Sequence, residues 1–152
     1  MALELPASPA CAPFNPCANF RSRSSFKLSK SPRCIAVVDD DMVIRIALNS
    51  LLRAAGHRVV LFASGEDFLE SLNVFLPDCV LVDLLMPGFS GLDVLSRLTA
   101  DRRDIPAIVV TGSTDEALEK KALDAGARAL VRKHVRAEQL FAAIDAALTH
   151  QE

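Results

Sequence analysis

Short runs of apolar residues recur along the chain from residue 34 onward, and they predict β-strands. Most of their residues are β-branched or otherwise apolar, which is typical of strands that helices cover on both faces. The predicted strands are residues 34–38, 58–62, 79–82 and 107–110, with a shorter fifth run at 129–131. A parallel sheet is the arrangement that such runs favour.

Helical patterns separate these runs. Apolar residues recur at spacings of three and four, as at Phe141, Ile144 and Leu148, which is the period of an amphipathic helix. The predicted helices are residues 41–55, 64–73, 91–100, 114–125 and 136–149. The alternation of strand and helix predicts an α/β fold, a doubly wound five-stranded parallel sheet with helices on both faces.

The first 33 residues differ from the rest in composition. They carry five basic residues and one acidic residue, a net +4, whereas residues 34–152 carry 12 basic and 18 acidic residues, a net −6. We expect residues 1–33 to form a disordered basic tail rich in serine and proline, because they show no helical period. The alternatives are an organelle transit peptide and a start site placed too far upstream. The folded domain is expected at residues 34–150.

Whole-chain composition argues against several classes of protein. The 152 residues are 51% hydrophobic, which disfavours a largely disordered chain. Their net charge of −2 argues against nucleic acid or a membrane surface as a general partner. No apolar stretch approaches the roughly 20 residues of a membrane-spanning helix, so we expect a cytoplasmic protein. The four cysteines form no C-x-x-C pair and favour neither a disulfide framework nor a zinc site.

Chemically active side chains stand where four of the predicted strands end. Asp39, Asp40 and Asp41 follow the first strand, and Asp83 follows the third. The carboxyl ends of parallel strands meet at one edge of a sheet, where crowded carboxylates would repel one another unless a cation lies between them. Oxygen ligands favour Mg²⁺.

Two further strand ends complete this predicted cleft. Thr111 follows the fourth strand, and Lys133 comes shortly after the fifth. A hydroxyl and an ammonium group at the same edge suit the outer oxygens of a phosphoryl group. The strand ends therefore predict phosphoryl transfer onto a carboxylate.

Four motifs in this order make residues 34 to about 150 resemble the receiver domain of two-component response regulators. They are residues 37–41, 81–88, 109–112 and 125–127, the last followed by Lys133. The resemblance implies a flavodoxin-like fold with strand order 2-1-3-4-5. It also implies a phosphoprotein that signals in a phosphorelay and catalyses only its own aspartyl phosphorylation and dephosphorylation.

The resemblance also implies roles for individual residues. Asp83 would be the phospho-acceptor, and Thr111 and Lys133 would bind phosphoryl oxygens. Asp40 and Asp83 would bind Mg²⁺ directly, Asp39 would bind it through water, and the backbone carbonyl of Leu85 would complete the protein ligands.

The same resemblance implies partners. The phosphoryl donor would be a sensor histidine kinase or a histidine phosphotransfer protein, and the output would pass to a protein target along residues 114–149. We expect no nucleic-acid or membrane partner, and a monomer or weak homodimer. A receiver needs nearly all of residues 34–152, so we expect a single-domain regulator.

Two positions depart from the receiver pattern. Leu130 stands where an aromatic residue often precedes the lysine by three positions, and His134 stands where a proline usually follows it. Leu130 excludes an aromatic rotamer switch in its usual form. The bond after Lys133 is expected to be trans, since a cis bond before a residue other than proline costs about 2.5–4 kcal/mol. The alternatives are this trans bond with Lys133 displaced, or a strained cis bond held by surrounding contacts. We expect Lys133 still to reach the edge of the site, but with less constraint.

Three alternative interpretations stay open. Asp39, Asp40 and Asp41 are also suited to capping the following helix. Residues 38–43 satisfy the D-x-D-x-V opening of haloacid-dehalogenase-like phosphatases, with Asp39 as nucleophile, although Asp83 then precedes Thr111 in the wrong order. A receiver fold that binds partners without phosphorylation is the third, although no acidic or lysine position of the site is lost.

Overall fold

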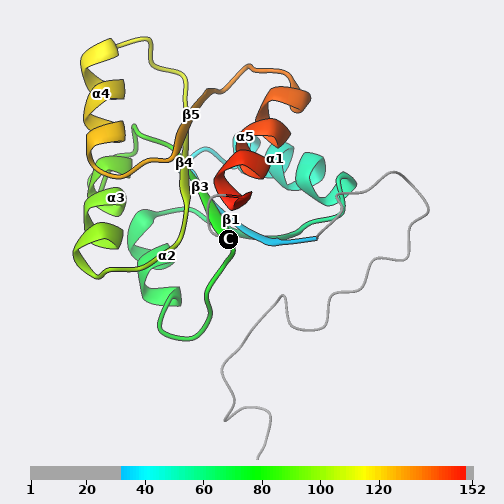
Figure 1. Ribbon diagram of the computed structural model, residues 1–152, viewed down its shortest axis with the longest axis horizontal. Coiled ribbons are helices and arrows are strands. Elements are labelled where there is room, and N and C mark those ends of the chain that lie inside the picture. Colours follow the sequence, from blue (N-terminus) through cyan, green and yellow to red (C-terminus); the bar gives the residue numbers. More distant parts are fainter. Residues whose placement is uncertain (1–31, 150–152) are drawn as a thin grey trace, which may run out of the picture.

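The computed structural model describes residues 32–149 (Figure 1). Nearly all of the expected basic tail lies outside these residues. Five strands and five helices alternate along the described part. The strands are β1 (Cys34–Val38), β2 (Arg58–Phe62), β3 (Cys79–Val82), β4 (Ala107–Thr111) and β5 (Ala129–Arg132). The helices are α1 (Met42–Ala54), α2 (Gly65–Ser71), α3 (Gly91–Ala100), α4 (Glu116–Asp124) and α5 (Ala137–Thr149).

All strand pairs are parallel, and the strands lie in the order β2-β1-β3-β4-β5. Both the predicted doubly wound sheet and the predicted strand order are confirmed. β1 pairs with β2 on one side and with β3 on the other, so the winding of the chain reverses beside β1. In sheets of this kind ligands bind beyond the carboxyl ends of the strands at such a reversal.

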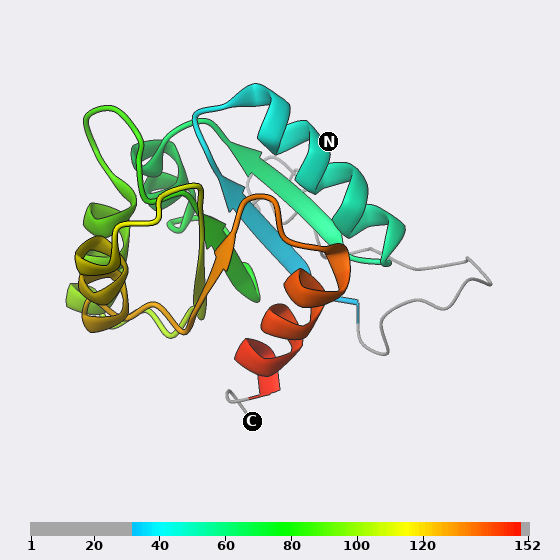
Figure 2. The same cartoon turned by 90° about the horizontal axis from the view of Figure 1, so that it is seen from above.

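The helices cover both faces of the sheet, with α1 and α5 on one face and α2, α3 and α4 on the other (Figure 2). Alternate residues of β1 face opposite sides of the sheet. Ala36 and Val38 pack into the core under α2 to α4, whereas Ile35 and Val37 pack into the core under α1 and α5. The near-continuous apolar runs follow from this double burial.

Side-chain caps determine where the helices begin. Ser64 Oγ accepts a hydrogen bond from the Asp67 N–H at 3.1 Å, so Ser64 caps α2 and is not its first residue. Asp115 caps α4 in the same way, which is why both helices begin slightly later than predicted. Gly126 follows α4 with a φ of +116°, a conformation that glycine adopts without strain. No helix in the described part is long and apolar enough to cross a membrane.

Cys34 is disulfide-bonded, although the cysteine spacing did not favour a disulfide framework. Cys79 is a free thiol inside β3. Burial raises the pKa of the Cys79 thiol to about 12. This thiol therefore stays protonated and packs as a small apolar side chain.

His57 is a buried polar residue at the edge of the sheet opposite the strand ends considered above. Its Nδ1 accepts a hydrogen bond from the backbone N–H of Arg33 at 3.1 Å, so this nitrogen is unprotonated. Burial lowers the pKa of His57, Asp145 and Asp78 oppose the shift, and Arg33 adds to it. His57 is therefore protonated at lower pH in the folded chain than in the unfolded chain.

We expect His57 to make the fold less stable as the pH falls. Below the unfolded-state value of 6.5 the unfolded chain binds the proton first, and stability is lost as the pH falls further. In His57→Asn an amide oxygen can still accept the Arg33 N–H, but the side chain does not titrate. The difference in melting temperature between the two proteins should change between pH 7.5 and pH 5.5, with the wild type losing more. A difference independent of pH would contradict this account.

Candidate functional site

The two central strands bring the acidic residues together. β1 and β3 are neighbours, and the Asp83 N–H donates a hydrogen bond of 3.0 Å to the carbonyl of Val38, the last residue of β1. One carboxylate oxygen from each of Asp39, Asp40 and Asp83 lies within 4.8 Å of the others. Asp39 and Asp83 are buried, whereas Asp40 is exposed. The sequence prediction that these residues meet at one edge is therefore confirmed.

Lys133 reaches this cluster from beyond β5. Its Nζ lies 3.1 Å from Asp83 Oδ2 and 3.3 Å from Asp39 Oδ2. The described residues contain no cis peptide bond, so the expected trans bond after Lys133 is confirmed. Lys133 reaches the site as expected, and its Nζ contacts with both carboxylates show no displacement from it. The Lys133 N–H donates to the Thr111 carbonyl at 2.9 Å. That bond aligns Lys133 with the end of β4.

Burial and charge set the protonation of the two central groups. Burial raises the pKa of Asp83, the Asp39 carboxylate raises it further, and bonds from Lys133 and from the Leu85 N–H oppose the rise. Burial alone would lower the pKa of Lys133, but its hydrogen bonds and attraction to Asp83 and Asp39 outweigh burial and raise it. Lys133 therefore stays charged and offsets the repulsion between the two aspartates.

The three aspartates after β1 have different roles. Asp41 caps α1, since its Oδ1 accepts the Val43 N–H at 2.9 Å. The Asp41 N–H in turn donates to Asp39 Oδ1 at 2.9 Å. The capping interpretation is therefore correct for Asp41, while Asp39 and Asp40 belong to the cluster.

The cluster has the chemistry of a site for a hard cation. Three carboxylates supply oxygen ligands, and the exposure of Asp40 leaves water access to one side. Sites of this kind suit Mg²⁺, which keeps several waters when it binds to proteins. Leu85, whose carbonyl is the fourth expected ligand, lies beside the cluster, because its N–H donates to Asp83 Oδ1 at 3.2 Å.

Thr111 ends β4 and is fully buried. Its Oγ1 accepts the backbone N–H of Ser113 at 3.0 Å, which leaves the hydroxyl hydrogen able to donate elsewhere. The strand order places β4 beside β3 and β5. Thr111 is therefore at the same sheet edge as Asp83 and Lys133, as the sequence predicts.

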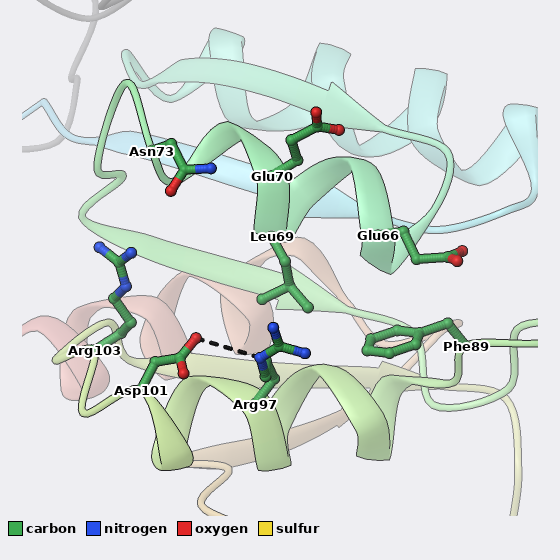
Figure 3. Close-up of a pocket in the computed structure, with 8 residues that line it drawn as sticks. All are labelled: Glu66, Leu69, Glu70, Asn73, Phe89, Arg97, Asp101 and Arg103. Atoms are coloured by element: carbon green, nitrogen blue, oxygen red, sulfur yellow. Dashed lines mark ion pairs between the residues drawn. The ribbon is translucent and has the colours of Figure 1, made fainter.

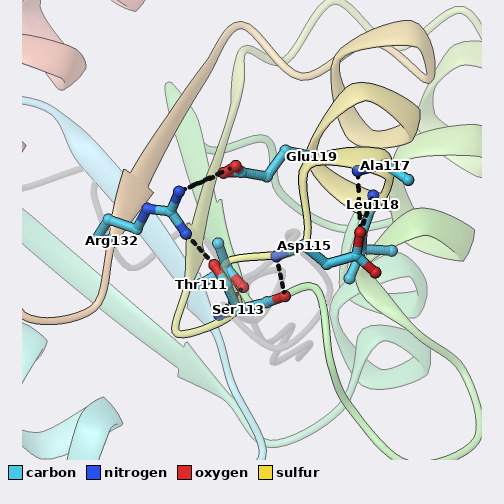
Figure 4. Close-up of polar contacts among 7 residues, drawn as sticks. All are labelled: Thr111, Ser113, Asp115, Ala117, Leu118, Glu119 and Arg132. Atoms are coloured by element: carbon cyan, nitrogen blue, oxygen red, sulfur yellow. Dashed lines mark hydrogen bonds and ion pairs between the residues drawn. The ribbon is translucent and has the colours of Figure 1, made fainter.

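Two arginines near the site make contacts that the sequence analysis did not predict. Arg45, on the first turn of α1, donates from Nη1 to the Asp39 carbonyl at 2.6 Å. Its position on the first turn of α1 was the available signal. Side chains of a helix point back toward its N-terminus, and the N-terminus of α1 lies just after Asp39. Arg132, directly before Lys133, contacts Ser113 and Glu119 (Figure 4). Nothing in the local sequence pattern indicates the contacts of Arg132 with Ser113 and Glu119.

The start of α3 packs tightly against the phospho-acceptor segment. The Gly91 N–H donates to the Leu84 carbonyl at 3.1 Å. A Cβ on Gly91 would lie 2.3 Å from the backbone oxygen of Asp83. Only glycine permits this approach of the helix to the strand end.

A separate hollow lies between α2 and α3, and none of the site residues lines it (Figure 3). Its wall includes the ion pair between Arg97 and Asp101 at 3.4 Å. The other lining residues are Glu66, Leu69, Glu70, Asn73, Phe89 and Arg103.

Known proteins agree with this geometry. Residues 35–145 match the family model described as the response regulator receiver domain. The transcriptional regulatory protein FixJ of Bradyrhizobium diazoefficiens is 36% identical over 118 residues, which are 78% of this chain and 58% of FixJ. The response regulator protein TmoT of Ectopseudomonas mendocina is 40% identical over 75% of this chain and 52% of TmoT. The chain thus spans about half the length of these relatives.

Solved structures show the same fold. A CheY-like receiver domain protein from Methanospirillum hungatei superimposes with a TM-score of 0.74 at 27% identity, over 80% of this chain and 97% of that chain. The crystal structure of FixJ-N gives a TM-score of 0.74 at 30% identity, over 79% and 96% of the two chains. The family match and the strand order β2-β1-β3-β4-β5 support the receiver interpretation over the haloacid-dehalogenase-like one. The chain belongs to the response regulator receiver domain family of two-component signalling proteins.

Proposed function

We propose that Asp83 accepts a phosphoryl group from a phosphohistidine of a sensor histidine kinase or histidine phosphotransfer protein, in a Mg²⁺-dependent reaction. The contact of Lys133 Nζ with both Asp83 and Asp39, at 3.1 and 3.3 Å, is the observation that carries the proposal. This contact brings the positively charged Lys133 ammonium group to the Asp83 carboxylate, which would attack phosphorus.

Each residue has a role in this reaction. An Asp83 carboxylate oxygen attacks phosphorus as the phosphorus–nitrogen bond to the donor histidine breaks, and the histidine leaves with the electron pair of that bond. Lys133 and the Thr111 hydroxyl bind the phosphoryl oxygens. Asp40, Asp83 and the Leu85 carbonyl would hold Mg²⁺ directly, and Asp39 would hold it through water. When bound, the ion supplies positive charge that offsets the negative charge of carboxylates and phosphoryl group.

The functional unit in this proposal is residues 34–150, and residues 1–33 are a tail outside it. Its signal passes to a protein target along residues 114–149, and the unit is a monomer or weak homodimer. The chain's only catalysis is its own aspartyl phosphorylation and dephosphorylation. Phosphorylation-independent binding by the same fold has no observation in its favour beyond the fold itself.

Incubation with Mg²⁺ and a small phosphodonor such as phosphoramidate tests the proposal. We expect intact-mass spectrometry to show one added phosphate, which hydroxylamine or alkali removes, as they do from an acyl phosphate. Chelation of Mg²⁺ and the variant Asp40→Asn should each slow the reaction strongly, because both weaken the metal site. A phosphate that resists hydroxylamine, or one added equally fast without Mg²⁺, would overturn the proposal.

A further inference from the structure

An arginine-centred network joins the end of β5 to the loop between β4 and α4 (Figure 4). Arg132 Nη2 contacts both carboxylate oxygens of Glu119, at 2.6 and 3.1 Å. Arg132 Nη1 donates to the carbonyl of Ser113. The Glu119 side chain is 16% exposed and the Arg132 side chain 46% exposed, so solvent partly screens the pair.

Ser113 connects this network to the candidate site. Its carbonyl is bound by Arg132, and its N–H donates to Thr111 Oγ1 at 3.0 Å. The Ser113 hydroxyl accepts the Asp115 N–H at 3.0 Å, at the start of α4. Both backbone polar groups of Ser113 are therefore engaged, one by the arginine and the other by the threonine hydroxyl.

We propose that Arg132 is a positioning residue for Thr111 in the phosphorylation of Asp83. Arg132 holds Ser113, and Ser113 in turn holds the Thr111 hydroxyl with its acceptor side occupied and its hydrogen free to donate. A hydroxyl fixed in this way needs no reorientation when a phosphoryl oxygen arrives. This inference rests on the proposed function, because it assigns Thr111 to the phosphoryl group.

The pairing of β4 with β5 gives this role a physical basis, because Arg132 is the partner of Thr111 in that pairing. Leu130, two residues earlier, pairs with Val109 and offers no polar group. Arg132 uses two different nitrogens for two partners. A lysine ammonium cannot reproduce that fork, since all its donors share one nitrogen. The restraint on the loop is therefore specific to arginine.

The test compares Arg132→Ala with the wild type in the full chain. We expect the rate of phosphorylation by phosphoramidate at saturating Mg²⁺ to fall about fivefold, the effect of one lost net hydrogen bond. Arg132→Lys should recover only part of the rate. The matched control is Arg128→Ala, which removes an arginine with a 32% exposed side chain, paired with Asp104 at 3.6 Å, beside the opposite end of β5. This control should keep the wild-type rate.

A double-mutant cycle separates positioning from a general structural effect. If Arg132 acts through Thr111, Arg132→Ala should have little further effect on the rate in a Thr111→Ala background. The same fivefold loss in that background would overturn the inference, and so would an unchanged rate in Arg132→Ala alone.

Hydrogen exchange distinguishes this inference from the proposed function. The Ser113 amide, protected by Thr111 Oγ1, should exchange faster in Arg132→Ala and not in Arg128→Ala. Unchanged exchange overturns the inference even if the wild type is phosphorylated normally. Absence of phosphorylation in the wild type overturns the proposed function, and with it the assignment of Thr111.

Discussion

Asp83→Asn is expected to abolish phosphate incorporation while the fold remains intact. An amide oxygen is a poor nucleophile and cannot form the acyl phosphate. The asparagine Oδ1 can still accept the Leu85 N–H, which lies 3.2 Å from Asp83 Oδ1. Lys133 keeps its contact with Asp39. Intact-mass spectrometry with Mg²⁺ and phosphoramidate measures incorporation, and circular dichroism checks the fold.

Asp41→Asn is the matched control for this experiment. Asp41 stands in the acidic triplet but caps α1 through the Val43 N–H, and asparagine caps helices about as well as aspartate. The control should incorporate phosphate at close to the wild-type rate. Incorporation into Asp83→Asn would show that another residue is the acceptor.

Gly91→Ala is expected to lower both stability and phosphorylation. The added Cβ would lie 2.3 Å from the Asp83 backbone oxygen and 2.8 Å from Leu84 Cα. Because both neighbours are backbone atoms, either α3 or the Asp83 segment must shift. Overpacking of this kind typically costs about 1–3 kcal/mol of unfolding free energy. The midpoint of urea unfolding should fall, and the displaced Asp83 should be phosphorylated more slowly.

Gly112→Ala is the control, because this glycine is also close to the site. Its added Cβ would meet Lys133 Cδ at 3.8 Å, an ordinary contact. We expect a change in unfolding free energy of no more than about 0.5 kcal/mol. Equal destabilisation by the two substitutions would show that the close approach of Gly91 to Asp83 is unimportant.

Sequence patterns predicted the elements of the fold well because the strands are buried on both faces. A run such as residues 79–82 has no polar alternation to misread, and β3 is observed at Cys79–Val82. Errors occur at helix ends, where a cap such as Ser64 resembles the helix it precedes. The disulfide of Cys34 was missed because cysteine spacing alone does not show which thiols meet in space.

The candidate site was predictable only in part. Residues at strand ends, such as Asp39 and Asp83, could be expected to meet because parallel strands share one carboxyl edge. Arg45 and Arg132 could not be placed in this way, since long side chains reach partners that depend on rotamers and loop paths. Lys133 reaches the site as its place after the fifth strand predicts. The hydrogen bond from its own N–H to the Thr111 carbonyl, which aligns this residue, depends on the loop path and could not be predicted from the sequence.

Three buried strands anchor the site. Every residue of β1, β3 and β4 is buried, and amides in such central strands typically exchange only when the whole domain unfolds. Asp39, Asp83 and Thr111, at or just after the ends of these strands, are therefore attached to the least mobile part of the molecule. Thr111 is followed by a short loop in which Ser113 and Asp115 are bonded to each other and to side chains. In the proposed phosphorylation of Asp83, this loop is the part that can rearrange by local opening while the three strand ends stay in place.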